Sequence, residues 1–209
     1  MTPAPHLALW STTDAPLVLA SSSAIRRVLL ETSGLPVEVN PATIDERSIE
    51  AALLGRPAAD VAATLAAAKA ETVSRSLPHR IVLGADQTLA VAGRQLHKAA
   101  SRREAAEHLE LLSGRTHQLH SGLALAMNGH TIWSHVETAT LAVRPLSAAF
   151  IHAYLDAAGD TILKSVGAYQ IEGLGMHLFA SIEGDHSTIL GLPLLPLLRQ
   201  LRNMGLVAE

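Results

Sequence analysis

Two short, continuous apolar runs most constrain the fold of this chain. They are LVLA at residues 17–20 and IVLGAD at residues 81–86. Each run is too short for a buried helix, and neither alternates with polar residues as a strand facing water would. A continuous apolar run of about 4–8 residues is typical of a strand that is buried on both faces. Because helices must then cover both faces of the sheet, the runs predict an α/β fold.

Helix signals separate these strands along the chain. The sequence predicts helices at 24–33, from Pro57 through Lys69, at 101–113, at 147–158 and from Pro193 to about Met204. Glycines at 34, 114 and 159 are typical of helix ends, and Ser101 with Glu104 forms a capping box. These signals place the helices between the strands and not in a separate bundle.

The remaining strands give the sheet its mixed character. Residues 37–39 and 176–182 alternate in polarity, and the segments 116–127 and 130–143 flank Asn128-Gly129, a strong hairpin signal. Strands and helices thus alternate at both ends of the chain around a central hairpin. We therefore expect an extended mixed β-sheet flanked by helices.

Composition limits the number of domains and the classes of partner. With 209 residues, 48% apolar, the chain is long enough to bury one sizeable core, and we expect a single domain at 16–209 after an N-terminal tail at 1–15. A net charge of −3 provides no global basic field, so we expect no nucleic acid partner. The absence of cysteine fits a reducing compartment, and no apolar span of ~20 residues is present. We expect a cytoplasmic protein without membrane contact.

The loop after the first strand is rich in groups that bind anions. Ser21, Ser22 and Ser23 precede a predicted helix that carries Arg26 and Arg27. Hydroxyls, free backbone N–H groups at a helix start and guanidinium groups together bind phosphate oxygens well. The alternative is that one serine caps the helix and the arginines are solvated. No GxxxxGK[ST] sequence is present, which excludes a P-loop.

Several acidic and basic residues lie near the ends of predicted elements. Asp45-Glu46 follows the second strand, and Asp86 ends the strand at 81–86. Ligands of α/β sheets bind beyond strand ends, where carboxylates can hold a divalent ion or take a proton from water. Each carboxylate could equally be a turn or capping residue. Lys69 and Lys98 also lie near element ends, and spacing alone favours a surface role for Lys98.

Other candidate signals are weak. Glu172 lies in GAYQIEGLG, where the glycines permit close backbone contact, but it could be a turn residue. His117 and His120 would point to opposite faces of a strand, which disfavours zinc. No serine lies in a G-x-S-x-G sequence, which argues against an acyl hydrolase.

Seven blocks, taken together, resemble the Maf family. They run in the family's order from residue 17 to about 204: LASSSAIRRVLL, PATIDE, AAAKA, VLGADQTL, HKAASRREAAEHLELLSGRTH, GAYQIEGLG and IEGDHSTILGLPL. The resemblance implies a nucleoside triphosphate pyrophosphatase, a hydrolase that cuts between the α and β phosphates with a divalent metal, Mg²⁺ or Mn²⁺. It also implies two lobes around a central cleft, as in the Maf/ITPase-like fold, and a homodimer.

The resemblance assigns roles by position. It makes Ser21, Arg26, Lys69 and Lys98 contacts to the substrate, and Asp86 the acceptor of a proton from water. Glu46 and Asp86 are its candidate metal ligands. The chain departs from the family where Ala24 replaces the first motif's proline, and where His97 and Ala99 replace glycine and proline around Lys98.

Three positions separate the branches of the family. The dTTP and UTP branch has arginine, threonine and glutamine where this chain has Ile25, Gln87 and Glu172, whereas the 7-methyl-GTP branch has an aromatic residue, glutamine and glutamate. A carboxylate at 172 can accept hydrogen bonds from the N1–H and N2–H₂ edge of guanine. GAYQ and IEGDHST are closer to the pyrimidine branch. We expect 7-methyl-GTP as the leading substrate.

Two alternatives are a dTTP/UTP pyrophosphatase and a nucleotide-binding regulator of septum formation without catalytic activity. The second belongs to a different class, since the family name records an association with septum inhibition. A regulator that has lost catalysis would be expected to lose charged cleft residues, yet Glu46, Lys69, Asp86 and Lys98 are all present.

Overall fold

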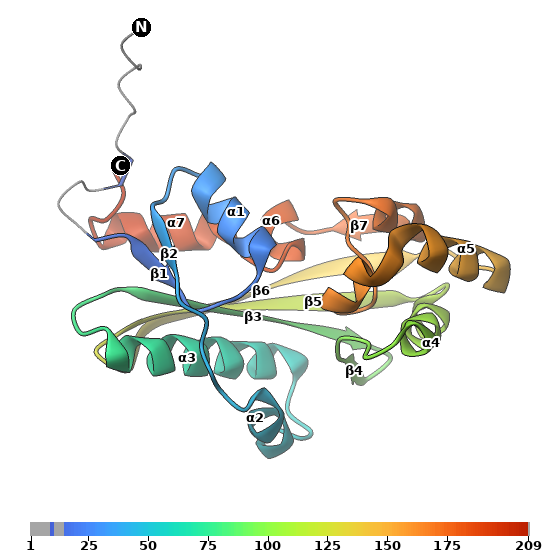
Figure 1. Ribbon diagram of the computed structural model, residues 1–209, viewed down its shortest axis with the longest axis horizontal. Helices are drawn as coiled ribbons and strands as arrows, with labels where there is room; N and C mark the ends of the chain where they lie inside the picture. The colour runs from blue at the N-terminus through green and yellow to red at the C-terminus, as the bar shows by residue number, and fades with distance from the viewer. Residues whose placement is uncertain (1–8, 11–14, 209) are drawn as a thin grey trace, which may run out of the picture.

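The computed structural model describes residues 9–10 and 15–208 and contains one seven-stranded mixed sheet with helices on both faces (Figure 1). The strands are β1 (Leu17–Leu19), β2 (Val37–Val39), β3 (Val82–Val91), β4 (Arg94–Leu96), β5 (Thr116–Met127), β6 (His130–Val143) and β7 (Phe179–Glu183). The helices are α1 (Ala24–Thr32), α2 (Glu46–Ala52), α3 (Ala58–Ser76), α4 (Arg102–Leu112), α5 (Ala148–Ala158), α6 (His186–Ile189) and α7 (Leu194–Asn203), with 3₁₀ helices η1 (Gly159–Lys164) and η2 (Leu174–Leu178). The predicted α/β class with a mixed sheet is confirmed.

The strand order is β2-β1-β3-β5-β6-β7, and β4 also pairs with β3. β1 runs parallel to β2 and β3, whereas β3, β5, β6 and β7 pair antiparallel. The predicted hairpin joins β5 and β6, and Asn128 and Gly129 have φ of 54° and 82°. Positive φ at both central residues is the requirement of a type I′ turn, which explains the Asn-Gly sequence.

Helices gather at both ends of the long strands (Figure 1), and buried side chains form a packed region at each end. At one end, α1 and α7 cover one face and α3 covers the other. At the other end, α4, α5 and η1 pack against the far parts of β3, β5 and β6. The polar stretches Asp86–Thr88 of β3 and His120–Ser121 of β5 separate the two regions.

α3 approaches the sheet unusually closely because it crosses two glycines. A Cβ on Gly84 of β3 would lie 2.0 Å from the carbonyl oxygen of Ala66, and one on Gly122 of β5 would lie 2.5 Å from that of Ala62. Both distances are far below van der Waals contact. The glycines of the sheet and the alanines of α3 therefore set the distance between α3 and β3. This distance determines how far Lys69 extends toward β3.

The structure corrects two expectations about element boundaries and contains a helix, α2, that was not expected. β3 continues to Val91, so Asp86 lies within the strand and does not end it. The strand predicted at 176–182 begins only at Phe179, because the residues before it form η2. The sequence analysis did not predict α2, although Asp45 caps it by accepting a hydrogen bond from the N–H of Ser48 at 3.1 Å.

Most of the predicted tail at 1–15 lies outside the described residues. Trp10, which is described, is only 7% exposed and pairs with Val207 in an isolated bridge. Trp10 therefore packs against the core beside α7. Within residues 9–10 and 15–208, no helix combines the length and the apolar character that a membrane crossing requires.

Replacing Gly84 by alanine should destabilise the fold, because the new methyl group would overlap the backbone of α3. We expect the free energy of unfolding to fall by about 3 kcal/mol, at the upper end of overpacking penalties. Urea unfolding followed by circular dichroism measures the change. Gly173→Ala is the matched control, since its Cβ would meet only the carbonyl oxygen of Gln170, at 4.0 Å. Equal midpoints for the two variants would contradict the close packing of α3.

Candidate active site

A break in the hydrogen bonding along one edge of β3 defines the candidate site. β5 pairs with β3 continuously from Val82 to Ala90, so β1 and β4 share the opposite edge. There β1 pairs only with Val82 and Leu83, and β4 only with residues 89–91. Residues 84–88 of β3 therefore have no strand partner on this edge. Because β1 and β4 run in opposite directions, the carboxyl ends of both strands point into the gap.

The loop after β1 brings Ser21 to this gap, and the first turn of α1 brings Arg26 there. Arg26 donates from Nη1 to the carbonyl oxygen of Ala85 at 2.7 Å and to Oγ of Ser21 at 3.2 Å, and from Nε to the carbonyl oxygen of Gly191 at 2.9 Å. Three contacts fix the guanidinium plane. Within the described part of the chain no such bond occupies Nη2, which leaves donor capacity for a ligand.

Ser22, Ser23 and Arg27 make fewer contacts at the gap than Ser21 and Arg26 do. Ser23 precedes α1 as its N-cap without a side-chain capping bond, and its N–H points to Oγ of Ser21 at 3.3 Å. Ser22 is exposed, and Arg27 forms a solvent-exposed pair with Glu31 at 3.4 Å. The polar triplet therefore centres on Ser21, which is only 8% exposed.

Lys69, Asp86 and Glu46 form a charged cluster on the α3 side of the sheet. Nζ of Lys69 lies 2.5 Å from Oδ1 of Asp86 and 2.8 Å from Oε1 of Glu46. Lys69 and Asp86 are 9% and 8% exposed, whereas half of the Glu46 side chain is exposed. Burying an ion pair costs desolvation that the attraction rarely exceeds, so the pair is weak evidence for a stabilising role. Its placement at the gap favours a functional one.

The charges of Arg26 and the cluster act on one another across β3. Burial lowers the pKa of Arg26 because it penalises the charged guanidinium, while the negative charges of Asp86 and Glu46 oppose the shift. An arginine pKa starts so far above neutrality that the side chain stays charged. Two cations and two carboxylates therefore face one site.

Gln87 and Ile25 each adjoin a residue of the site in sequence, but their surroundings differ. Nε2 of Gln87 donates to Oγ of Ser121 at 3.0 Å and to the carbonyl oxygens of Thr188 and Ile189 at 3.2 and 3.0 Å. Its amide nitrogen is thus engaged by protein groups. Ile25 is partly buried in the first turn of α1 and directly precedes Arg26.

Lys98 and Glu172 are exposed, and in the described residues no hydrogen bond or ion pair joins either to Asp86, Lys69 or Arg26. Lys98 lies two residues beyond β4, at the opposite end of the gap from Ser21, and its backbone pairs with Val166. Glu172 lies in the turn before η2. The structure therefore brings Ser21, Arg26, Lys69, Asp86, Glu46 and Gln87 together directly, and Lys98 by its place at the gap.

Sequence reasoning missed two backbone groups that hold Arg26. The carbonyl oxygen of Ala85 is free to accept because it lies on the open edge of β3, and that of Gly191 comes from a turn 165 residues away in sequence. No side-chain pattern marks either acceptor. The Gly-Leu-Pro sequence at 191–193 contributed only as part of one of the blocks that resemble the Maf family.

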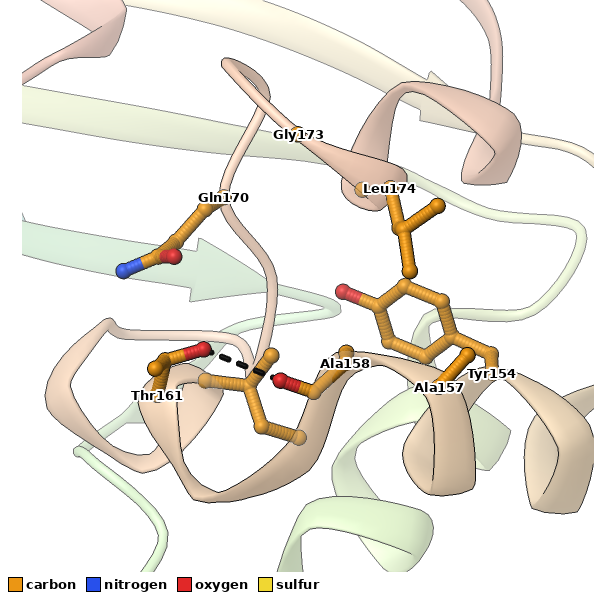
Figure 2. A pocket seen from close by; sticks show the side chains of 9 residues that line it. Tyr154, Ala157, Ala158, Thr161, Gln170, Gly173 and Leu174 are labelled. Atoms are coloured by element: carbon orange, nitrogen blue, oxygen red, sulfur yellow. Dashed lines mark hydrogen bonds between the residues drawn. The ribbon is translucent and has the colours of Figure 1, made fainter.

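A small pocket of about 190 Å³ lies elsewhere, between α5, η1 and the turn at 170–175 (Figure 2). Tyr154, Thr161 and Gln170 are its polar lining residues, and no charged side chain lines it. It therefore does not suit a polyanion, although Gln170 and Gly173 flank Glu172.

The two histidines considered as metal ligands have other partners. Nε2 of His117 lies 2.7 Å from the hydroxyl of Tyr169, and burial lowers the pKa of His117 to about 4. Nδ1 of His120 lies 2.9 Å from Oγ1 of Thr138. Both therefore serve packing on β5.

Sequence comparisons with known proteins indicate which family this chain resembles. The sequence profile of the family described as Maf-like protein matches residues 16–204. A nucleoside triphosphate pyrophosphatase of Nitrobacter winogradskyi is 51% identical over 97% of this chain and 100% of its own. A 7-methyl-GTP pyrophosphatase of Rhizobium meliloti is 50% identical over 91% of this chain and 97% of its own.

Similarity to solved structures is weaker. A nucleoside-triphosphatase, or dITP/XTP pyrophosphatase, of Mycobacterium abscessus aligns over 90% of this chain and 96% of its own with a TM-score of 0.40 and 18% identity. That value is too low to add to the fold described above. The match of the family profile to nearly the whole chain, together with relatives at about half identity over their full length, shows that this chain belongs to the Maf family.

Proposed function

We propose that this protein is a nucleoside triphosphate pyrophosphatase that hydrolyses the bond between the α and β phosphates and releases a nucleoside monophosphate and pyrophosphate. The observation that carries the proposal is the convergence of Arg26, Lys69, Asp86 and Glu46 on the open edge of β3. The names of the relatives support the same reaction.

Charge balance explains why the site suits a triphosphate only together with further cations. The positive charges of Arg26 and Lys69 are offset by Asp86 and Glu46. A polyanion therefore needs additional positive charge, which Lys98 and a divalent ion would supply. Ser21 and the free Nη2 of Arg26 would donate hydrogen bonds to phosphate oxygens, a geometry that guanidinium groups favour.

Asp86 is the proposed acceptor of a proton from the attacking water. Lys69 holds Oδ1 of Asp86 at 2.5 Å, and among the described residues no hydrogen bond reaches Oδ2. Oδ2 is thus the atom available to orient water and take its proton as the new oxygen–phosphorus bond forms. The bond between phosphorus and the bridging oxygen breaks, and pyrophosphate leaves.

The donor set fits a divalent metal of the Mg²⁺ type. Asp86 and Glu46 both present carboxylate oxygens within contact of one Lys69 nitrogen, and hard cations prefer oxygen ligands. Mg²⁺ usually keeps several waters and is held by one or two carboxylates together with substrate phosphates, so two carboxylates are enough for such an ion. When bound, Mg²⁺ or Mn²⁺ would neutralise charge that develops on the phosphates.

We propose 7-methyl-GTP as the leading substrate, with dTTP and UTP as the alternative. Gln87 and Glu172 match the 7-methyl-GTP branch, and Glu172 is exposed and free of ion pairs within the described residues. A carboxylate there would accept hydrogen bonds from the guanine edge and favour the positive charge of a 7-methylated ring. The Rhizobium meliloti relative is named for this activity.

Asp86→Asn should lower turnover by about a hundredfold or more, because the amide cannot accept the proton. Pyrophosphate release from a nucleotide panel with Mg²⁺ or Mn²⁺ measures the effect, and thermal unfolding checks that the fold survives. Asp60→Asn is the matched control, since Asp60 pairs with Arg56 on the exposed start of α3. Unchanged release by Asp86→Asn would remove Asp86 from the base role.

The double change Gln87→Thr with Glu172→Gln should shift preference towards dTTP and UTP. The ratio of kcat/KM for 7-methyl-GTP to that for UTP should fall by about tenfold or more, since a site built for one hydrogen-bonding edge discriminates against another. Each single change separates the base contact at 172 from the packing role of Gln87. An unaltered substrate ranking in the double variant would contradict the assignment.

A further inference from the structure

A row of three polar side chains crosses the sheet between its two apolar regions. Gln87 of β3 pairs with Ser121 of β5, which pairs with Glu137 of β6. Directly opposed residues of neighbouring strands share a face, so the three side chains form one line. On this face apolar side chains lie on either side of the row, Ala85 and Leu123 on one side and Leu89, Leu119 and Ala139 on the other.

All three side chains of the row bind one residue, Thr188 of α6. Ser121 donates from Oγ to the carbonyl oxygen of Thr188 at 2.8 Å, and Gln87 donates from Nε2 to the same oxygen at 3.2 Å. The hydroxyl of Thr188 donates to Oε2 of Glu137 at 3.0 Å. Ser121 and Thr188 are fully buried. The row thus anchors α6, which has only four residues, to the middle of the sheet.

The turn after α6 transmits this anchoring to Arg26. The N–H of Gly191 donates to the carbonyl oxygen of Thr188 at 3.0 Å, and the carbonyl oxygen of Gly191 accepts from Nε of Arg26 at 2.9 Å. Gly191 has φ of 88°, and a Cβ there would lie 3.2 Å from Nη2 of Arg26. A side chain would therefore both strain the turn and crowd the guanidinium.

We propose that Glu137, Ser121 and Thr188 are positioning residues for Arg26. The row holds Thr188, Thr188 holds the Gly191 turn, and that turn fixes the guanidinium plane so that Nη2 faces the gap in β3. The inference rests on the proposed function in one respect, that Arg26 binds the triphosphate. It also gives Gln87 a second role, since its amide nitrogen supports the same turn and is not free for a base.

Glu137 is the most informative residue of the polar row, because within the described structure its carboxylate forms no ion pair and binds Thr188. Its carboxylate accepts a charge-assisted bond from Thr188, which is stronger than a bond between neutral groups. Placing polar side chains between two apolar regions is costly unless each finds a partner. Apolar residues at these positions would join the two regions into one core, but they would leave α6 without its anchor.

The test uses the full chain and the isosteric change Thr188→Val, which removes only the hydroxyl that binds Glu137. Inorganic tripolyphosphate with Mg²⁺ is the probe, and isothermal titration calorimetry gives its dissociation constant. We expect binding to weaken by about five- to tenfold, which is less than the roughly tenfold or more of a lost hydrogen bond to a charged group, because the lost bond acts on the ligand only through Arg26. KM for the nucleotide should rise by a similar factor while kcat changes by less than about threefold, since Arg26 binds substrate and transition state alike.

Conservative variants of Thr188 and Glu137 distinguish a positioning role from a general loosening of the fold. Thr188→Ser keeps the hydroxyl and should bind tripolyphosphate as the parent does. Glu137→Gln keeps an acceptor but loses the charge, so it should weaken binding less than Thr188→Val does, whereas Glu137→Leu should behave like Thr188→Val. Thr138→Val is the matched control, because Thr138 neighbours Glu137 on β6 but faces His120 on the opposite side of the sheet.

Parental binding by Thr188→Val, alongside lost binding by Arg26→Gln, would overturn the inference. Equal weakening by Thr138→Val would overturn it as well, since the effect would then be unspecific. A parent chain that binds tripolyphosphate but releases no pyrophosphate from any nucleotide would contradict the proposed function alone, and the binding data would still decide the positioning role.

Discussion

The interrupted edge of β3 is the constraint on which the arrangement of the site depends. β3 is held on one side by β5 along nearly its whole length, so it stays extended and rigid although its other side is unpaired between β1 and β4. Because β1 and β4 have three residues each, the gap remains open. Side chains on both faces of β3 can therefore meet one ligand, and the edge carbonyl of Ala85 can hold Arg26, which a fully paired strand would prevent.

The two faces of the sheet deliver different chemistry to this edge. The α3 face supplies the charged cluster, and Lys69 reaches Asp86 only because glycines on β3 and β5 let α3 lie close. The face beneath α6 supplies Arg26, which is fixed by backbone carbonyls and not by carboxylates. The guanidinium hydrogen-bonds neutral acceptors and feels the charges of Asp86 and Glu46 only from a distance, whereas Lys69 contacts both carboxylates directly.

Local signals predicted most of the elements, and contacts between distant segments explain what was missed. The Asn128-Gly129 turn and the cap at Ser101 are local, and the structure has both. Asp86 was placed at a strand end because the apolar run stops there, yet antiparallel pairing with β5 carries the strand on through polar residues. The loop sequence itself marked Arg26 as a candidate anion contact, whereas the role of Lys69 as a substrate contact followed from family resemblance. No local pattern shows that Lys69 meets Asp86 or that Arg26 meets Gly191.

The contacts of Gln87 link a position proposed to select the base to the turn that holds Arg26. Its amide nitrogen is committed to Ser121 and to the carbonyl oxygens of α6, so it influences a base only through its oxygen or through the position of the Gly191 turn. A threonine at this position has a shorter side chain and one donor, and it could not reach the same three acceptors. Replacing Gln87 by threonine would therefore weaken the support of the Gly191 turn, and Arg26 would be held less firmly. A change aimed at base recognition would then also act on phosphate binding, because both depend on the same turn.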